Sequence, residues 1–194
     1  ILKVPFSLPR TKPKALNYAM QYVQGKYLVV YDAEDKPHPD QLLNAIATFV
    51  HLPPEYVCVQ AKLNFYNKDE NLLTKLFSIE YHLWFEYILK GLSILNLPMP
   101  LGGTSNHFKV DALRSIGCWD PYNVTEDADL GIRLYSHGYK VHMIDSYTLE
   151  ESPITVGNWM NQRARWIKGF IQTFFVFLSS KNKDTKFTYY QRIS

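Results

Sequence analysis

The chain is poor in the residues that build zinc sites or disulfide frameworks. Its 194 residues include two cysteines, Cys58 and Cys118, with no CxxC pair, and six scattered histidines with no HExxH spacing. Neither kind of scaffold is therefore supported. The net charge of +3 is mild and mixed in sign, so charge alone gives no reason to expect a nucleic-acid partner.

Long hydrophobic runs are also missing. No run of about 18 apolar residues occurs, so the sequence predicts no membrane-spanning helix. Two stretches, 83–97 and 170–178, come closest, and polar residues interrupt both. They fit interfacial or groove-lining helices, with ordinary buried core helices as the alternative. The chain starts at Ile1 without an initiator Met, and we expect it to be a piece of a longer protein.

The residues that are present predict one globular α/β domain. The chain is 46% hydrophobic and 15% aromatic, and it contains neither an internal repeat nor a Gly/Ser linker. Amphipathic segments alternate with short apolar runs, which predicts a mostly parallel central sheet flanked by helices. The expected helices are 11–25, 39–50, 71–97, 110–117, 125–138 and 155–178, and the expected strands are 27–32, 56–63 and 139–145, with 102–110 expected as a loop that runs into a strand.

An acidic segment, "YDAED", follows the first expected strand. Ligands of open α/β sheets bind beyond the carboxyl ends of strands. In extended geometry Asp32 and Glu34 would point the same way and could hold Mg²⁺ or Mn²⁺ together with substrate phosphates. Asp35 adds a third carboxylate. The alternative is an exposed acidic turn, because Asp favours turns.

A second acidic segment, "TEDAD", begins the expected helix 125–138. Thr125 is a suitable N-cap, and Glu126 and Asp127 complement the helix dipole, so capping alone explains all three residues. The aromatic and turn-rich approach "GCWDPYNV" indicates that this helix end borders a site. There an ionised Asp127 could act as a general base.

The segment "QRARW" places Gln162, Arg165 and Trp166 on one face of the last helix. An amide and an indole suit a sugar, and a guanidinium suits a phosphate. The alternative is a basic amphipathic helix whose tryptophan is half-buried.

The order "DAED", "TED", "QRARW" resembles the processive family 2 glycosyltransferases, the group of cellulose, hyaluronan and chitin synthases. The resemblance runs from about residue 9 to 170. "PRTKPKALN" looks like the lysine-containing segment of the family and "LGGTSNHF" like its Gly-Ser acceptor loop. It implies a GT-A nucleotide-diphospho-sugar transferase sandwich, truncated at both ends. Residues 1–194 would then be the C-terminal portion of the catalytic domain, with 170–194 leading towards a membrane-proximal region.

The resemblance also implies roles for individual residues. Asp127 is implied as the catalytic base, Arg165 as the residue that faces the pyrophosphate, and Gln162 and Trp166 as contacts of the acceptor sugar. The remaining implied residues are Asp32, Glu34 and Asp35 at the metal, Glu126, Gly103 and Ser105 at the substrate, and Lys12 and Lys14 near the donor diphosphate.

The implied activity is the inverting, metal-dependent transfer of a sugar from a nucleotide-sugar, expected to be a UDP-sugar, to a growing glycan or lipid-linked acceptor. Mg²⁺ or Mn²⁺ is the implied cofactor, and no nucleic acid is expected. The domain would lie on the cytoplasmic side of a membrane, most simply the bacterial inner membrane, with spanning helices and the first strand outside this chain. A metal-dependent phosphotransferase or nuclease, and a non-catalytic glycan- or nucleotide-binding module, are the rival hypotheses.

Overall fold

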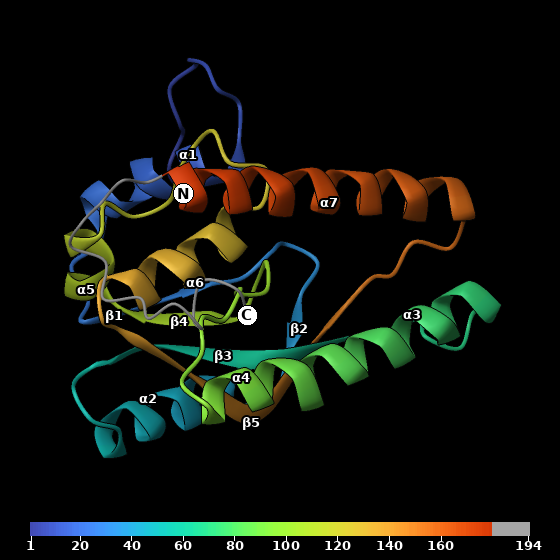
Figure 1. The fold of residues 1–194 in the computed structure, drawn as a ribbon, viewed down its shortest axis with the longest axis horizontal. Coiled ribbons are helices and arrows are strands. Elements are labelled where there is room, and N and C mark those ends of the chain that lie inside the picture. The colour runs from blue at the N-terminus through green and yellow to red at the C-terminus, as the bar shows by residue number, and fades with distance from the viewer. Residues whose placement is uncertain (180–194) are drawn as a thin grey trace.

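The computed structural model describes residues 1–179, and it forms a five-stranded sheet surrounded by helices (Figure 1). Residues 180–194, and with them much of the expected membrane-proximal segment, lie outside the described residues. The strand order is β1-β4-β3-β5-β2. The strands are β1 (Tyr27–Val30), β2 (Lys36–Pro37), β3 (Tyr56–Phe65), β4 (Asn106–Lys109) and β5 (Lys140–Glu150).

The sheet is mixed, so the expectation of mostly parallel pairing is wrong, although the α/β class is confirmed. Only β3 and β5 pair in parallel within residues 1–179, and the other three pairings are antiparallel. The reason lies in β4, which enters the sheet beside the end of β1, with Asn106 opposite Val30. From there β4 runs back between β1 and β3. An alternation of helices and strands along the sequence does not reveal this reversal.

Helices cover both faces of the sheet. Helix α2 (Gln41–His51) buries Ala45 and Phe49 against Val59 and Ile144 on one face. The larger core on the other face is built around residues such as Phe108 and is covered by the remaining helices. These are α1 (Lys12–Ala19) with the 3₁₀ turn η1 (Met20–Tyr22), α3 (Leu72–Leu83), α4 (Lys90–Ile94), α5 (Val110–Ser115) and α6 (Glu126–Ser136).

The expected helix over 71–97 is confirmed, with one irregularity. It begins at a capping box in which Asn71 and Thr74 exchange side-chain-to-backbone hydrogen bonds. Between α3 and α4 it passes through a π-helical segment, η2 (Trp84–Leu89). The wider turn there buries Phe85 and Leu89 in the core.

The last helix, α7 (Val156–Ser179), lies along α6 outside the sheet (Figure 1). Gly169 faces the buried Thr125, and Asn123 donates a hydrogen bond to Thr173 Oγ1 at 2.9 Å. These contacts fix α7 against the start of α6. No helix within residues 1–179 combines the length and the apolar character needed to cross a membrane.

Candidate active site

The chain turns sharply where β1 ends, so the expected extended geometry of residues 32–34 is wrong. The Asp35 amide donates to the Asp32 carbonyl at 3.2 Å, and the Asp32 amide donates to Asp35 Oδ2 at 2.7 Å. The turn therefore brings Asp35 back beside Asp32. Glu34, at the tip of the turn, is exposed.

The two carboxylate oxygens of Asp35 differ in their hydrogen bonding. Its Oδ2 also accepts a hydrogen bond from the Thr104 hydroxyl, whereas Oδ1 is buried without a partner among the described residues. Burial is the main cause of a raised pKa for this carboxyl group, and the hydrogen bond from Thr104 opposes it. A buried carboxylate oxygen without a donor fits a site that takes up a cation.

Lys12 links the turn to the glycine-rich loop. Its ammonium forms an ion pair with Asp32 and donates to the Gly103 carbonyl at 2.8 Å. The neighbouring Lys14 is directed elsewhere, because it donates to the carbonyls of Pro5 and Ser7 at 3.3 and 2.6 Å. Of the two lysines expected near the donor diphosphate, the structure thus brings only Lys12 to the acidic turn.

Asp127 lies on the other side of the same loop. A Cβ atom built on Gly103 would come within 3.2 Å of Asp127 Oδ2, so glycine allows the loop to approach the carboxylate closely. The Ala128 amide donates to Asp127 Oδ1 at 2.8 Å. Burial raises the pKa of Asp127, while the Lys12 charge lowers it and the Asp32 charge raises it. Asp32, Lys12 and Asp127 therefore share one electrostatic environment.

The two residues before Asp127 differ in their surroundings. Burial, followed by the Asp127 charge, raises the pKa of Glu126 to about 7. Thr125 occupies the N-cap position, but its hydroxyl makes no capping hydrogen bond and is buried without a partner among the described residues. The expectation that the Thr125 hydroxyl caps α6 is therefore wrong, because this side chain packs against Gly169 of α7 instead.

Ser105 does not reach the surface of the cleft. It is fully buried, and its hydroxyl donates to Thr148 Oγ1 at 2.6 Å. Behind it, the fully buried Gln41 donates to Thr148 Oγ1 at 3.1 Å and accepts from the Tyr31 hydroxyl at 2.8 Å. These bonds join the glycine-rich loop to the ends of β1 and β5, so Ser105 supports the loop from the interior.

The "QRARW" residues are spread over more than one environment. The Trp166 ring is half-buried and lies 6.1 Å from the Phe77 ring and 6.2 Å from the Tyr81 ring, both on α3. Gln162 is half-buried and its Oε1 has no partner among the described residues, whereas Arg165 is exposed. Trp166 and Gln162 thus belong to a half-buried wall, and Arg165 is free to move towards an anion.

Two residues that the sequence did not single out lie near this site. Glu150 ends β5, and burial, reinforced by the charges of Asp35 and Asp32, raises its pKa to about 8. Burial raises the pKa of Tyr81 well above its usual range, and the charges of Glu150 and Asp127 add to the effect. Tyr81 therefore lies close to the Trp166 ring and within the influence of the carboxylate charges. The expected strand stopped at residue 145, whereas β5 continues to Glu150, so no signal in the sequence indicated this residue.

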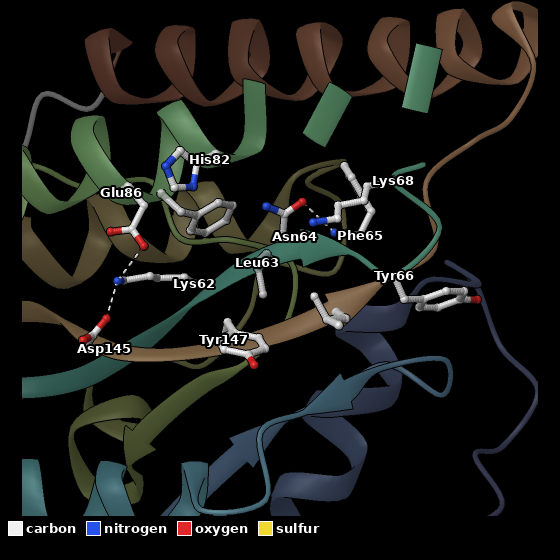
Figure 2. A pocket seen from close by; sticks show the side chains of 12 residues that line it. Lys62, Leu63, Asn64, Phe65, Tyr66, Lys68, His82, Glu86, Asp145 and Tyr147 are labelled. Atoms are coloured by element: carbon white, nitrogen blue, oxygen red, sulfur yellow. Dashed lines mark hydrogen bonds and ion pairs between the residues drawn. The ribbon is translucent and has the colours of Figure 1, made fainter. Parts of the chain in front are cut away.

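A separate groove of about 450 Å³ lies between β3, β5 and η2 (Figure 2). Lys62 crosses it and forms ion pairs with Glu86 at 2.7 Å and Asp145 at 2.5 Å. The lysine side chain is 12% exposed, so the two carboxylates neutralise a largely buried charge. No residue that the sequence predicted as functional lines this groove within residues 1–179.

Solved structures with a similar fold identify the architecture. The mannosyltransferase PcManGT from Pyrobaculum calidifontis, in complex with GDP-Man and Mn²⁺, superimposes with a TM-score of 0.68 at 20% identity, over 89% of this chain and 45% of that one. Glucosyl-3-phosphoglycerate synthase from Mycobacterium tuberculosis, in complex with Mn²⁺ and UDP-glucose, superimposes with a TM-score of 0.52 at 13% identity. The match covers 88% of this chain and 56% of that one. The fold is that of the GT-A glycosyltransferases.

Sequence comparison defines the family. Residues 27–193 match the family described as glycosyl transferase family group 2, and the chain belongs to it. Probable glucomannan 4-beta-mannosyltransferase 3 of Oryza sativa subsp. japonica is 31% identical over 155 residues, which is 79% of this chain and 28% of the relative. Glucomannan 4-beta-mannosyltransferase 2 of Arabidopsis thaliana is 30% identical over 167 residues, which is 84% of this chain and 31% of the relative. The chain thus spans less than a third of each of these two relatives.

Proposed function

We propose that this chain carries part of the catalytic site of a hexosyltransferase, which moves a sugar from a nucleoside-diphosphate sugar to a hydroxyl group. The observation that carries the proposal is the meeting of Asp32, Lys12 and Asp127 around Gly103. Carboxylates for a cation, a lysine for phosphate and a separate base are thereby gathered at one edge of the sheet.

We assign the residues of this site to different steps of the reaction. Asp127 is the proposed base that removes the proton from the acceptor hydroxyl, because its carboxylate lies directly beside the glycine-rich loop at Gly103. Lys12 and the exposed Arg165 are proposed to stabilise the negative charge that develops on the departing diphosphate. A single base and no side chain assigned as nucleophile imply inversion at the anomeric carbon.

A divalent cation, Mg²⁺ or Mn²⁺, is part of the proposal. Asp32 and Asp35 would hold it, and the buried, unpartnered Oδ1 of Asp35 supports this assignment over one that relies on the exposed Glu34. No three His, Cys, Asp or Glu side chains within residues 1–179 are grouped so as to bind a metal by themselves. Such ions commonly take one or two carboxylates and complete their shell with water and substrate phosphates. The bound cation supplies positive charge at the diphosphate.

GDP-mannose is the donor to test first, ahead of a UDP-sugar, because relatives are named as mannosyltransferases and PcManGT, of similar fold, was solved in complex with GDP-Man. Membranes containing the full-length protein would be incubated with radiolabelled GDP-mannose, UDP-glucose or UDP-N-acetylglucosamine, with MnCl₂ or with EDTA. We expect Mn²⁺-dependent incorporation of one sugar into a glycan product. Absence of transfer from every donor, with intact donor binding, would favour a binding module, and cleavage of added nucleic acid would favour the nuclease hypothesis.

We also propose that the whole enzyme works at a membrane surface. The outer faces of α3 and α7 carry exposed apolar side chains, among them Leu76, Ile79, Ile167, Ile171 and Phe174. Amphipathic helices of this kind bind at the interface between water and lipid. From the resemblance to the polysaccharide synthases we propose that the domain lies on the cytoplasmic side and uses a glycan or lipid-linked acceptor. Protease protection in oriented vesicles would test the side.

A further inference from the structure

Arg163, the second residue of "QRARW", is enclosed by aromatic rings. Its guanidinium carbon lies 4.7 Å from the centre of the Phe77 ring, 5.0 Å from the Trp166 ring and 5.4 Å from the Trp159 ring. The same guanidinium forms an ion pair with Glu80. A planar cation can stack on rings and donate to a carboxylate at the same time, which an ammonium group does less well.

The contacts of Arg163 cross from one helix to another. Trp159 and Trp166 belong to α7, whereas Phe77 and Glu80 belong to α3. The arginine side chain is 23% exposed and its Nε is buried without a partner among the described residues, so the group is held in a largely dry junction. The attraction between a cation and a ring is stronger in such surroundings than on an open surface.

Trp166 is the ring that connects this junction to the cleft. Tyr81 lies 6.2 Å from Trp166 between ring centres, and the charges of Glu150, Arg163 and Asp127 all act on the pKa of Tyr81. An indole free to rotate would present its face to a sugar only part of the time. The position of the Arg163 cation relative to the indole therefore affects the geometry of the acceptor wall.

We propose that Arg163 is a positioning residue that holds the Trp166 indole against α3 in the orientation that receives the acceptor sugar. The arginine itself does not touch the substrate in this proposal. The assignment of the acceptor rests on the proposed function, whereas the restraint on the indole does not. Two experiments separate these parts.

The first experiment observes the indole directly. Full-length protein labelled with 5-fluorotryptophan would be studied by fluorine NMR, and the Trp166 signal would be identified by its loss in W166F. We expect R163A to shift or broaden that signal, R163K to have a smaller effect, and K168A, which removes an exposed cation from the same helix, to leave it unchanged. An unchanged Trp166 signal in folded R163A would overturn the proposal, whether or not the enzyme transfers mannose.

The second experiment measures the consequence for transfer, with labelled GDP-mannose and a β-1,4-linked mannotetraose acceptor. We expect R163A to raise the KM for the acceptor about tenfold, as loss of a desolvated cation–π contact would. The KM for the donor should change by no more than about twofold. Combining R163A with W166A should add nothing to W166A alone, because the arginine acts through the indole. Additive losses would instead show that Arg163 acts independently of Trp166, and would overturn the proposal.

Discussion

Gly169 of α7 lies directly against the Thr125 side chain at the start of α6. A Cβ atom at position 169 would come within 2.4 Å of both Thr125 Oγ1 and Thr125 Cγ2. Real atoms do not approach this closely, so the two helices meet here only because residue 169 has no side chain. Along the chain, Thr125 lies two residues from Asp127 and Gly169 lies three residues from Trp166.

The Gly169 contact leads to a prediction with a matched control on the same helix. G169A should push α7 away from Thr125 and lower the free energy of unfolding by about 1–3 kcal/mol, the usual cost of overpacking. G157A, where a Cβ atom meets nothing within 4 Å, should leave stability unchanged or slightly raised. Urea unfolding of both variants is the measurement. Equal stabilities would contradict the close packing of α7.

The role of Asp127 can be separated from helix stabilisation by changing it to asparagine. An amide cannot accept the acceptor proton, so D127N should reduce transfer by about 10²- to 10⁴-fold. Donor affinity, measured by calorimetry on the same preparation, should persist because the proposed role of Asp127 is on the acceptor side. A D127N enzyme that retains more than about a tenth of wild-type transfer would exclude Asp127 as the base.

The acidic turn predicts an unequal effect of its three carboxylates on metal binding. D32A and D35A should abolish Mn²⁺-dependent binding of the nucleotide-sugar, because Asp32 and Asp35 face each other across the turn. E34Q, which changes the exposed residue, should be milder. Electron paramagnetic resonance of Mn²⁺ provides a readout that does not depend on turnover. Stronger damage from E34Q than from D35A would reverse the assignment.

Glu150 predicts a dependence of stability on pH. Its pKa rises from an ordinary 4.5 to about 8 in the folded protein, so the folded state holds this proton more tightly than the unfolded state. The stability contributed by the bound proton is complete below about pH 4.5 and is lost as the pH rises to about 8. The E150Q variant should lack this loss of stability with rising pH. The E151Q variant, which changes the exposed neighbour, should still show the loss. Thermal melts from pH 5 to 9 without added metal would show a decline of equal size in wild type and E150Q if the assignment is wrong.

The sequence predicted the helices and most strands because each carries a local pattern. The period of α7 and the apolar run of β1 are both visible within a few residues. The two-residue strand β2 has no such pattern, since it exists only through its pairing with β5. The direction of β4 also depends on where the chain re-enters the sheet, which no local signal records.

The candidate site was predictable where a residue type alone suggests chemistry. Asp32, Asp127 and Lys12 meet as the motifs suggested, although their roles stay predictions. The turn that brings Asp35 to Asp32 depends on a hydrogen bond to the Asp35 side chain. The prediction of extended backbone for this segment did not include that bond. The surroundings of Arg163 were not predictable for a similar reason, because its guanidinium contacts the Phe77 ring on α3, which is far away in the sequence.

The placement of α7 outside the sheet also sets the order in which parts of the cleft can open. This helix packs on its neighbours along one side, so it can detach without breaking any pairing between strands. Such a helix is a natural unit of local unfolding, and its amide hydrogens should exchange with solvent before those of β3 and β5. Detachment would uncover Tyr81 while the acidic turn at the end of β1 stayed in place. Hydrogen exchange would therefore report the loosening of α7 separately from that of the sheet.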